Sequence, residues 1–497
     1  LARRPREPAS TLRPLRPRRI RRLRRARRRT HRRTGHTRPL QGGLPLSQRN
    51  PQTTRHSPAE REALSTFAAP ETIDKKPVRA EITAPINWIN PGWITLAASI
   101  ALAALGLYAI SLSGGLDGRS ARLDTASLVT KQTVFIAIGL VACAAFALPH
   151  HRLFRRLATP LATAATALLV FVLIPFVPES IVTPRNGARR WISLGFTDFQ
   201  PSELAKIAFV FATALYLRNR TSHRTVLGLA GPAIIALVPV TLILVEPDLG
   251  TSLLFFPALL AMLIAAGAKI AHLLSTAAIA AAFAAAVVAA SLALAQTGSY
   301  PLLRPHQVER IQAVADQFTG SEDLHKQDRG FQGYKARTLI GAGGPAGLPE
   351  QRARGLIEYS RLPEPHNDMI FAVIANRFGF VGAATVIALY LVWFTSAIAA
   401  AAVSKDPFAR LVAVGIAAIV LAQATVNIGM TAGILPITGM TLPFVSYGGS
   451  SLVTAFAMTG LVLNVALRRP THLWQPSFEF HQNNNKNKSH RNTARST

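Results

Sequence analysis

Two oppositely charged side chains stand at the start of one apolar stretch. Glu203 and Lys206 follow Pro201 in the segment Gln200–Lys206, and a proline suits the first turn of a helix. Because Glu203 and Lys206 are three residues apart, they share a helical face and can neutralise each other. At a membrane boundary, such a pair is typical either of an ion pair that anchors a helix end or of a polar cavity. The spacing alone leaves both interpretations open.

Two further segments place polar groups at membrane depth, where burying them costs free energy. The connection Glu246-Pro247-Asp248-Leu249-Gly250-Thr251 packs two acids close to hydrocarbon, which favours a function or a buried cation partner, such as Lys206 or a nearby arginine. Residues 433–451 combine Gly, Pro and hydroxyl side chains, among them Ser446, at membrane depth. Irregular backbone there is tolerated only when it is buried in protein or lines a cavity. A packing motif of small residues is compatible with the same composition.

The composition joins two unlike regions. The 497 residues carry a net charge of +31, yet 49% are hydrophobic. Residues 1–90 hold 23 Lys plus Arg against 6 Asp plus Glu, or +17, which leaves +14 for the other 407. We expect 1–90 to be a basic, disordered cytoplasmic segment, and 471–497 to be a polar cytoplasmic tail. Since the first methionine is Met262, part of the arm is also open to interpretation as upstream, untranslated sequence.

The apolar stretches predict an all-α, polytopic membrane protein with about ten transmembrane helices. Each stretch is long enough to cross a hydrocarbon core of about 30 Å. The lone cysteine, Cys143, excludes an intrachain disulfide and a cysteine-based zinc site. No DNA-reading motif accompanies the basic arm, so no nucleic-acid partner is expected. The predicted spans are Trp93–Leu112, Leu128–Leu148, Ala158–Val177, Pro201–Leu217, Val226–Val245, Thr251–Ala268, Leu273–Ala295, Met369–Ala399, Ala409–Leu435 and Val445–Leu467.

The loop charges predict the orientation. With the N-terminus in the cytoplasm, eleven Lys plus Arg fall in the short inner loops and five in the short outer loops. This asymmetry follows the positive-inside rule and predicts that both termini are cytoplasmic. It also places the hydrophilic segment 296–367, between helices 7 and 8, outside the membrane. A loop this long is unusual without a function.

Four segments in order resemble the SEDS family (shape, elongation, division and sporulation), which includes FtsW, RodA and SpoVE. They are Asn186–Trp191 running into Gln200–Lys206, the Glu246–Thr251 connection, Leu362–Asp368, and Pro436–Ser451. The resemblance covers about residues 93–469, within a transmembrane domain that we place at 91–470.

The resemblance implies a peptidoglycan glycosyltransferase that polymerises lipid II at the outer face of the cytoplasmic membrane. A sugar 4-hydroxyl attacks the anomeric carbon of the growing chain, and undecaprenyl pyrophosphate leaves. This chemistry needs a carboxylate base and cations for the pyrophosphate. The implied partners are lipid II, a class B penicillin-binding protein (a transpeptidase), other division or elongation proteins and membrane lipid. The resemblance does not distinguish a role in division from one in elongation, although the sequence of Glu246–Lys269 is slightly more similar to FtsW and SpoVE than to RodA.

The family places its catalytic Asp in the long outer loop, shortly before a Gly-Tyr-Gln element and a glycine-rich turn. Here Gly330-Phe331-Gln332 follows Ser321-Glu322-Asp323, so Asp323 is the predicted general base. The spacing is several residues longer than usual, which leaves Asp328 and Glu322 as competitors.

The resemblance also implies the substrate-binding residues. Arg190, beside Trp191, and Lys206 match family cations that bind pyrophosphate or lipid phosphate, with Glu203 positioning Lys206. The resemblance implies no specific cofactor. His366 and Asp368 are expected either to hold a divalent cation (Mg or Mn) or to serve as residues that start a helix, and the sequence leaves both roles open. The set of expected substrate-binding residues also includes Asp248 and Ser446, from the two polar segments. It is completed by Arg310 and Arg337, which are expected to guide the anionic substrate.

Four positions depart from the family pattern. Asn376-Arg377 stands where two acids are usual, Glu246 where Gln is common and Phe331 where Tyr is common. These departures leave open a divergent or non-polymerising member. Two other classes of function are therefore considered: a lipid II flippase, since polar groups in a multispan bundle also suit translocation, and a non-catalytic scaffold of the division or elongation machinery. A polymerase requires the loop carboxylate, whereas the other two tolerate Asp323→Ala.

Overall fold

The structure is a computed structural model that describes residues 90–113, 119–185, 188–195, 197–218, 220, 225–275, 278, 282 and 328–468, without the side chains of 119–124, 185 and 328–331. These residues all belong to one compact unit, Lys76–Thr497. The predicted basic arm, the tail and most of the seventh span lie outside the described residues.

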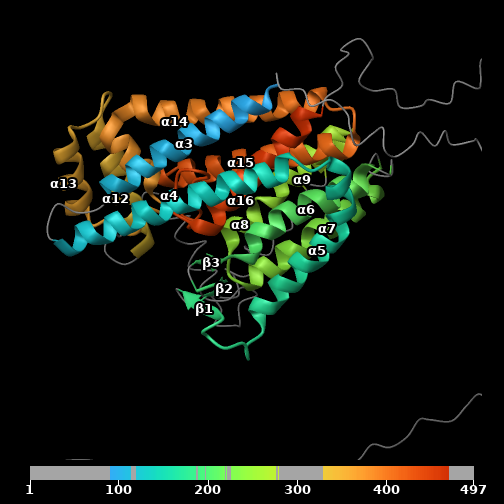
Figure 1. The fold of residues 1–497 in the computed structure, drawn as a ribbon, viewed down its shortest axis with the longest axis horizontal. Coiled ribbons are helices and arrows are strands. Elements are labelled where there is room, and N and C mark those ends of the chain that lie inside the picture. The colour runs from blue at the N-terminus through green and yellow to red at the C-terminus, as the bar shows by residue number, and fades with distance from the viewer. Residues whose placement is uncertain are drawn as a thin grey trace, which may run out of the picture. The chain divides into compact units, whose positions relative to one another are not determined.

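Long apolar helices dominate the described part of the chain (Figure 1). Seven are long and apolar enough to cross a membrane. The prediction of an all-α, polytopic membrane protein is thereby confirmed. The helices that match predicted spans are α3 (Gly92–Leu112), α4 (Arg119–Ala147), α5 (His151–Leu173), α6 (Pro201–Arg218), α7 (Ala230–Val245), α8 (Leu249–Leu253), α9 (Phe255–Ala265), α14 (Ile370–Val403), α15 (Pro407–Thr431) and α16 (Gly449–Leu467).

Two predicted spans differ from a simple apolar helix. Helix α6 carries Glu203, Lys206 and Arg218 within its 18 residues, which is more charge than the most apolar 18-residue window of any of the seven holds. The predicted span Thr251–Ala268 is interrupted at Leu254, which separates α8 from α9. The predicted third span begins too late, because α5 already starts at His151. It includes Arg152, Arg155 and Arg156, which the sequence analysis counted in an inner loop.

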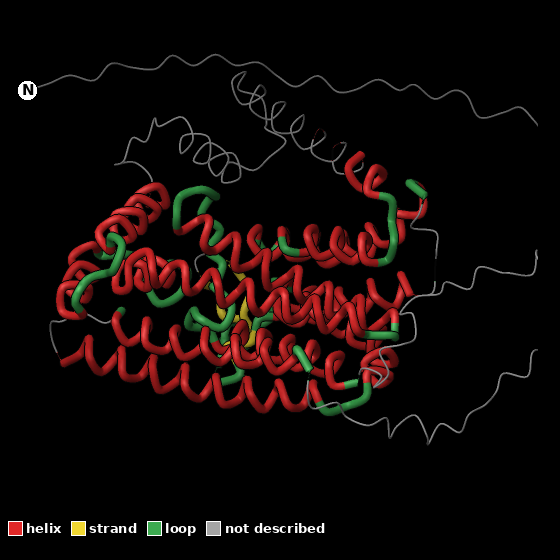
Figure 2. The backbone as a smooth tube through the Cα atoms, turned by 90° about the horizontal axis from the view of Figure 1, so that it is seen from above, coloured by secondary structure: helices red, strands yellow, loops and turns green. Residues whose placement is uncertain are grey.

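Burial separates central helices from peripheral ones. In the most apolar window, 78% of α16 and 61% of α15 is buried, against 22% for α4 and α5. Small residues permit the close contacts of the central helices: a Cβ on Gly460 of α16 would lie 2.2 Å from the Cys143 carbonyl oxygen of α4. The helices run side by side (Figure 2), and the strands lie together at one edge of the bundle, below α8 in Figure 1. The apolar outer faces of α4, α5 and α7, which are the least buried of the seven spans, are therefore available to lipid.

Short elements cover the end of the bundle at which α5 ends and α6 begins. A three-stranded antiparallel sheet joins these helices, with β1 (Val182–Arg185) paired to β2 (Ala188–Ser193) and β2 to β3 (Asp198–Phe199). The last part of the predicted long loop is helical: α12 (Asp328–Gly343) packs on α14, and α13 (Glu350–Ser360) contacts α14 and α3. We call this the site end.

The opposite end holds the starts of α3, α5 and α15 and the ends of α4, α6 and α16. A Cβ on Gly92 would touch Leu463 of α16, and the Asn464 amide donates to the Ala147 carbonyl at 2.8 Å. The Arg468 guanidinium also donates to Ala147, at 3.2 Å. We call this the basic end, because it holds Arg152, Arg155, Arg156, Arg218, Arg410 and Arg468.

Candidate functional site

The first turn of α6 carries a buried ion pair. The Lys206 Nζ lies 2.8 Å from Glu203 Oε1, as expected for residues three apart on one helical face. Both side chains are buried, with 2% of Lys206 and 5% of Glu203 exposed. Lys206 also donates to the Gln423 Oε1 of α15 at 3.1 Å. Two of the three N–H groups of the ammonium are therefore satisfied inside the protein.

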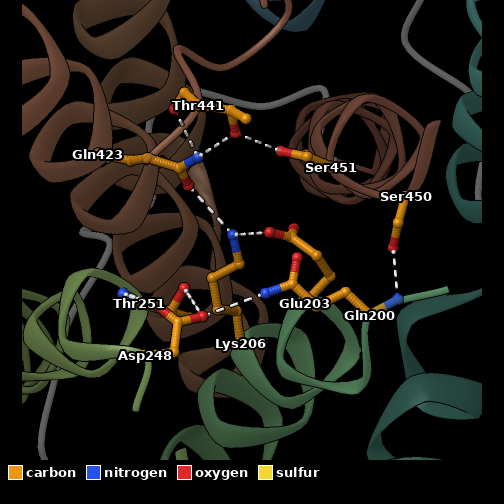
Figure 3. A network of polar contacts seen from close by, with 9 residues as sticks. All are labelled: Gln200, Glu203, Lys206, Asp248, Thr251, Gln423, Thr441, Ser450 and Ser451. Carbon is orange, nitrogen blue, oxygen red and sulfur yellow. Dashed lines mark hydrogen bonds and ion pairs between the residues drawn. The ribbon is translucent and has the colours of Figure 1, made fainter. Parts of the chain in front are cut away.

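The ion pair continues into a polar network that joins three helices (Figure 3). The Gln423 Nε2 donates to the Thr441 carbonyl at 3.0 Å. The Thr441 hydroxyl lies 3.0 Å from that of Ser451, on the first turn of α16. The irregular segment 433–448 is thus held between α15 and α16 by side chains as well as backbone, which satisfies its polar groups at membrane depth.

Asp248 forms a second part of the network. It is the N-cap of α8, where its carboxylate accepts from the Thr251 backbone at 3.1 Å and from the Thr251 hydroxyl at 2.9 Å. The same carboxylate accepts from Gln200 Nε2 at 3.1 Å, and the Gln200 backbone donates to Ser450 at 3.2 Å. Asp248 therefore ties the α7–α8 turn to Gln200 at the start of α6, and Gln200 in turn binds α16.

Arg190 and Glu246 meet at the α7–α8 turn. From β2, Arg190 donates its Nε to the Glu246 carbonyl at 2.7 Å and its Nη2 to the Pro247 carbonyl. The Glu246 carboxylate is 1% exposed and has no hydrogen-bond partner in the described part of the chain. Burial, with a smaller contribution from Asp248, raises the pKa of Glu246 to about 8, against the opposing effect of Arg190. Glu246 is therefore mainly protonated at pH 7.

The segment before α14 brings His366 and Asp368 to the same end. The Asn427 amide of α15 donates to the Asp368 carbonyl at 2.9 Å. Burial first, and then the carboxylates of Glu364 and Asp248, raise the pKa of Asp368 to about 6. The His366 Nε2 lies 3.5 Å from Glu364, while burial lowers the pKa of its imidazole. Asp248 is thus close enough to Asp368 for its carboxylate to disfavour ionisation of Asp368.

Ser446 makes contacts that are mainly structural. The Ser446 hydroxyl donates to the Asn367 carbonyl at 2.6 Å and accepts from the Leu442 backbone at 2.8 Å. It therefore holds the 433–448 segment against the one that carries His366. Trp191 is half-buried on β2, opposite Thr183 of β1.

Several predicted residues cannot be compared with this arrangement. Asp323, Glu322 and Arg310 lie outside the described residues, and Asp328 begins α12 without a described side chain. Arg337 lies on α12, with its side chain against Gly433. Within the described ranges no three His, Cys, Asp or Glu residues form a group suited to a metal ion. A divalent cation stays a prediction.

The departure at 376–377 has a structural account. The buried Asn376 donates to the Leu339 carbonyl of α12 at 2.9 Å. Arg377 donates to the Leu348 carbonyl at 3.0 Å and to the Tyr108 hydroxyl of α3 at 3.3 Å. Tyr108 in turn donates to Glu350, the first residue of α13, at 3.2 Å. These two residues attach α12 and α13 to the bundle, a task that carboxylates, which lack donors, cannot perform in the same way.

The sequence analysis missed the contribution of α15. Gln423 and Asn427 are buried and four residues apart, so they present amides on one helical face toward the site. Asn427 also donates to the Met440 carbonyl at 2.6 Å, which fixes the 433–448 segment. The signal was present, because two amides inside an apolar span need partners and are therefore informative.

Comparison with known proteins identifies the fold. The family model described as "Cell cycle protein", for FtsW, RodA and SpoVE, matches residues 93–470. The chain belongs to this family. The resemblance drawn from the four sequence segments is thereby confirmed.

Individual members of the family are similar over most of their length. Stage V sporulation protein E of Bacillus subtilis is 32% identical over 347 residues, which cover 69% of this chain and 88% of that protein. The probable peptidoglycan glycosyltransferase FtsW of Pseudomonas fluorescens is 30% identical over 398 residues, 78% of this chain and 90% of that one.

Solved structures agree with the sequence comparison. A chain from a peptidoglycan synthase complex that coordinates polymerization and crosslinking has a TM-score of 0.58 at 29% identity, covering 75% of this chain and 96% of that one. The rod shape determining protein RodA of Thermus thermophilus has a TM-score of 0.52 at 27% identity, covering 78% and 100%.

Proposed function

We propose that this protein is a peptidoglycan glycosyltransferase that polymerises lipid II during division or elongation. The observation that carries the proposal is the family match over residues 93–470, with a relative named as a probable peptidoglycan glycosyltransferase that is 30% identical over 78% of the chain. The polar network of Figure 3 supports it, because buried charges inside a membrane bundle are costly and mark functional cavities.

In the proposed reaction, Asp323 accepts the proton of the sugar 4-hydroxyl of one lipid II as its oxygen attacks the anomeric carbon of the growing chain. The bond from that carbon to the pyrophosphate oxygen breaks, and undecaprenyl pyrophosphate leaves with the electron pair. Arg190 and Lys206 provide positive charge for the leaving group, and Arg310 and Arg337 guide the substrate. Asp328 and Glu322 remain the competitors for the base.

The described geometry refines the role of Lys206. Its ammonium is buried and bonded to Glu203 and Gln423. Only the third N–H group is left for a phosphate, and because the side chain is buried, residues that cover it must move before a phosphate can reach it. In the described conformation the group acts through its positive potential and by positioning α6 against α15.

We assign the site end to the outer face of the cytoplasmic membrane, and both termini to the cytoplasm. The gathering of basic side chains at the opposite end supports this orientation through the positive-inside rule. A class B penicillin-binding protein is the proposed partner. The similarity to a chain of a peptidoglycan synthase complex that combines polymerization with crosslinking supports this choice.

The proposal is tested with the purified full-length chain, its partner transpeptidase and labelled lipid II. Wild type should make glycan chains, and Asp323→Ala should reduce their synthesis by at least about 100-fold. Asp328→Ala and Glu322→Ala, assayed in parallel, identify the base if Asp323 is not it. Glu179→Ala, which removes an exposed carboxylate at the site end, is the matched control and should keep activity.

The outcomes separate the three classes of function. Equal synthesis by wild type and all three loop variants would refute a catalytic carboxylate in this loop. No synthesis by wild type that still binds its partner would refute the polymerase and favour the scaffold or the flippase.

A further inference from the structure

One buried amide interrupts the apolar face that α4 presents to α16. The buried residues that the structure describes on α4 recur every three to four positions, which places them on one side of the helix, against α16. Among them Gln132, which is 0% exposed, is the one polar side chain. An amide at such a position costs free energy unless its donor and acceptor are bonded, so its contacts are informative. These buried residues are Gln132, Phe135, Gly139, Cys143 and Ala147.

Gln132 bonds to the two peptide groups that flank Tyr447. Its Nε2 donates to the Ser446 carbonyl at 3.1 Å, and its Oε1 accepts from the Gly448 N–H at 3.4 Å. These two peptide groups lie on either side of the Tyr447 Cα. The amide therefore holds the backbone of Tyr447 from both sides and so sets the direction of its ring.

Tyr447 connects α4 to the segment that carries His366. Its ring packs against Phe135, one turn after Gln132, with ring centroids 6.3 Å apart. The His366 imidazole meets the same ring edge to face, with centroids 5.7 Å apart and planes at 73°. The Tyr447 N–H also donates to the His366 carbonyl at 2.9 Å. The peptide group between Ser446 and Tyr447 thus accepts from Gln132 through its oxygen and donates to His366 through its nitrogen.

We propose that Gln132 is a positioning residue for the binding of lipid II. Through Tyr447 it holds His366 where the imidazole contacts the bound substrate. The inference rests on the proposed function, in which His366 is one of the substrate-binding residues. Gln132 itself is fully buried and acts only through its two neighbours. A role limited to joining α4 to α16 makes a different prediction, because the loss of any buried amide between these helices would then have the same effect on substrate binding.

The same helix pair supplies a matched control at the basic end. Asn464 of α16 is a buried amide that donates to the Ala147 carbonyl of α4 at 2.8 Å. Gln132→Met and Asn464→Leu each remove the amide and keep a side chain of similar shape. Both should lower the unfolding midpoint of the full-length protein in detergent, since each loses buried hydrogen bonds.

Binding of labelled lipid II to the full-length protein separates the two variants. Gln132→Met should raise the dissociation constant by at least about fivefold, whereas Asn464→Leu should stay within about twofold of wild type. With the partner transpeptidase present, Gln132→Met should likewise raise KM and leave kcat within about twofold, as expected when a binding contact is weakened.

A double-variant cycle tests whether Gln132 acts through His366. His366→Ala should weaken lipid II binding by itself. Adding Gln132→Met should then change the dissociation constant by less than about twofold, because the imidazole that Gln132 positions is absent.

A second pair of variants covers the case in which Gln132→Met does not fold. Phe135→Leu takes a ring away from Tyr447 and should weaken lipid II binding by at least about threefold. Phe146→Leu, which takes a ring away from Phe154 of α5 near the other end of α4, should not.

Equal lipid II binding by Gln132→Met and Asn464→Leu would overturn the proposal. So would equal binding by the two Phe→Leu variants, or a further loss of more than about twofold when Gln132→Met is added to His366→Ala. Wild type that binds lipid II without polymerising it would refute the proposed function alone, because the ratio of dissociation constants still tests Gln132. Wild type that binds no lipid II would refute both.

Discussion

At the residue scale, the buried pair of Glu203 and Lys206 is the feature whose energetics are best defined. Removing one partner of a buried ion pair leaves a charge without compensation and costs about 3–5 kcal/mol. Lys206→Met should therefore lower the unfolding midpoint strongly, and the double variant Glu203→Gln/Lys206→Met should recover most of the loss. Thermal unfolding in detergent measures this, with Lys269→Met at an exposed site as the control. A single variant no less stable than that control would contradict the assignment.

Glu246 predicts an unusual dependence of stability on pH. The pKa of its carboxyl is about 8 when folded, against an ordinary value of 4.5. Between these values the folded chain holds a proton that the unfolded chain has released, so stability falls as pH rises from about 4.5 to about 8 and levels above that. Glu246→Gln should remove this component and be more stable than wild type at pH 8 by a few kcal/mol.

The measurement is the unfolding midpoint of wild type and Glu246→Gln at several pH values. Glu179→Gln, at an exposed position, is the control and should follow wild type. Parallel curves for wild type and Glu246→Gln would show that Glu246 is ionised throughout and that the prediction is wrong.

The sequence allowed part of the described site to be predicted. Glu203 and Lys206 could be paired because a three-residue spacing on a helix fixes their relation. The acceptor Gln423, 217 residues away along the chain from Lys206, could not be assigned, because only the packing of α15 against α6 brings it there. The contacts of Arg190 with two carbonyls were missed for the same reason. A guanidinium can donate hydrogen bonds to backbone carbonyls as well as to phosphate oxygens, and the sequence does not distinguish the two kinds of acceptor.

At the scale of elements, the glycines of α16 set how closely α4 approaches. A Cβ at Gly460 would lie 2.2 Å from the Cys143 carbonyl oxygen, so Gly460→Ala must push the two backbones apart. Overpacking of this kind costs about 1–3 kcal/mol. Gly341→Ala is the control, since a Cβ there meets nothing within 4 Å on α12 and alanine favours a helix. Unfolding midpoints compare the two, and equal stability would contradict the close approach.

The long helices were predictable and the short elements were not. Apolar length alone indicates α3, α14 and α15, because a membrane core requires about 20 apolar residues. The strands of the sheet are two to six residues long, too short for a reliable alternation. Helix α13 did leave a signal, since its buried Ala353 and Ile357 are four apart. Its end is concealed by Arg361, which adopts the left-handed conformation that a glycine usually marks.

At the scale of the whole molecule, the orientation follows from which side chains share an end. The start of α3 packs on the end of α16, so the membrane domain begins and ends at the basic end. If that end is cytoplasmic, the site end is extracellular, where lipid II is polymerised in the proposed function. The lone Cys143 is 3% exposed, so a Cys143→Ala background permits single-cysteine labelling with little disturbance of the surface.

In that background, a membrane-impermeant maleimide should label Glu179→Cys in intact cells. It should label Arg220→Cys only after the membrane is permeabilised, because Arg220 follows α6 at the basic end. Labelling of Arg220→Cys alone in intact cells would invert the orientation and place the polar network of Figure 3 toward the cytoplasm. A polymerase acting at the outer face would then be excluded, since Lys206, Asp248 and Arg190 all lie at the end that carries Glu179.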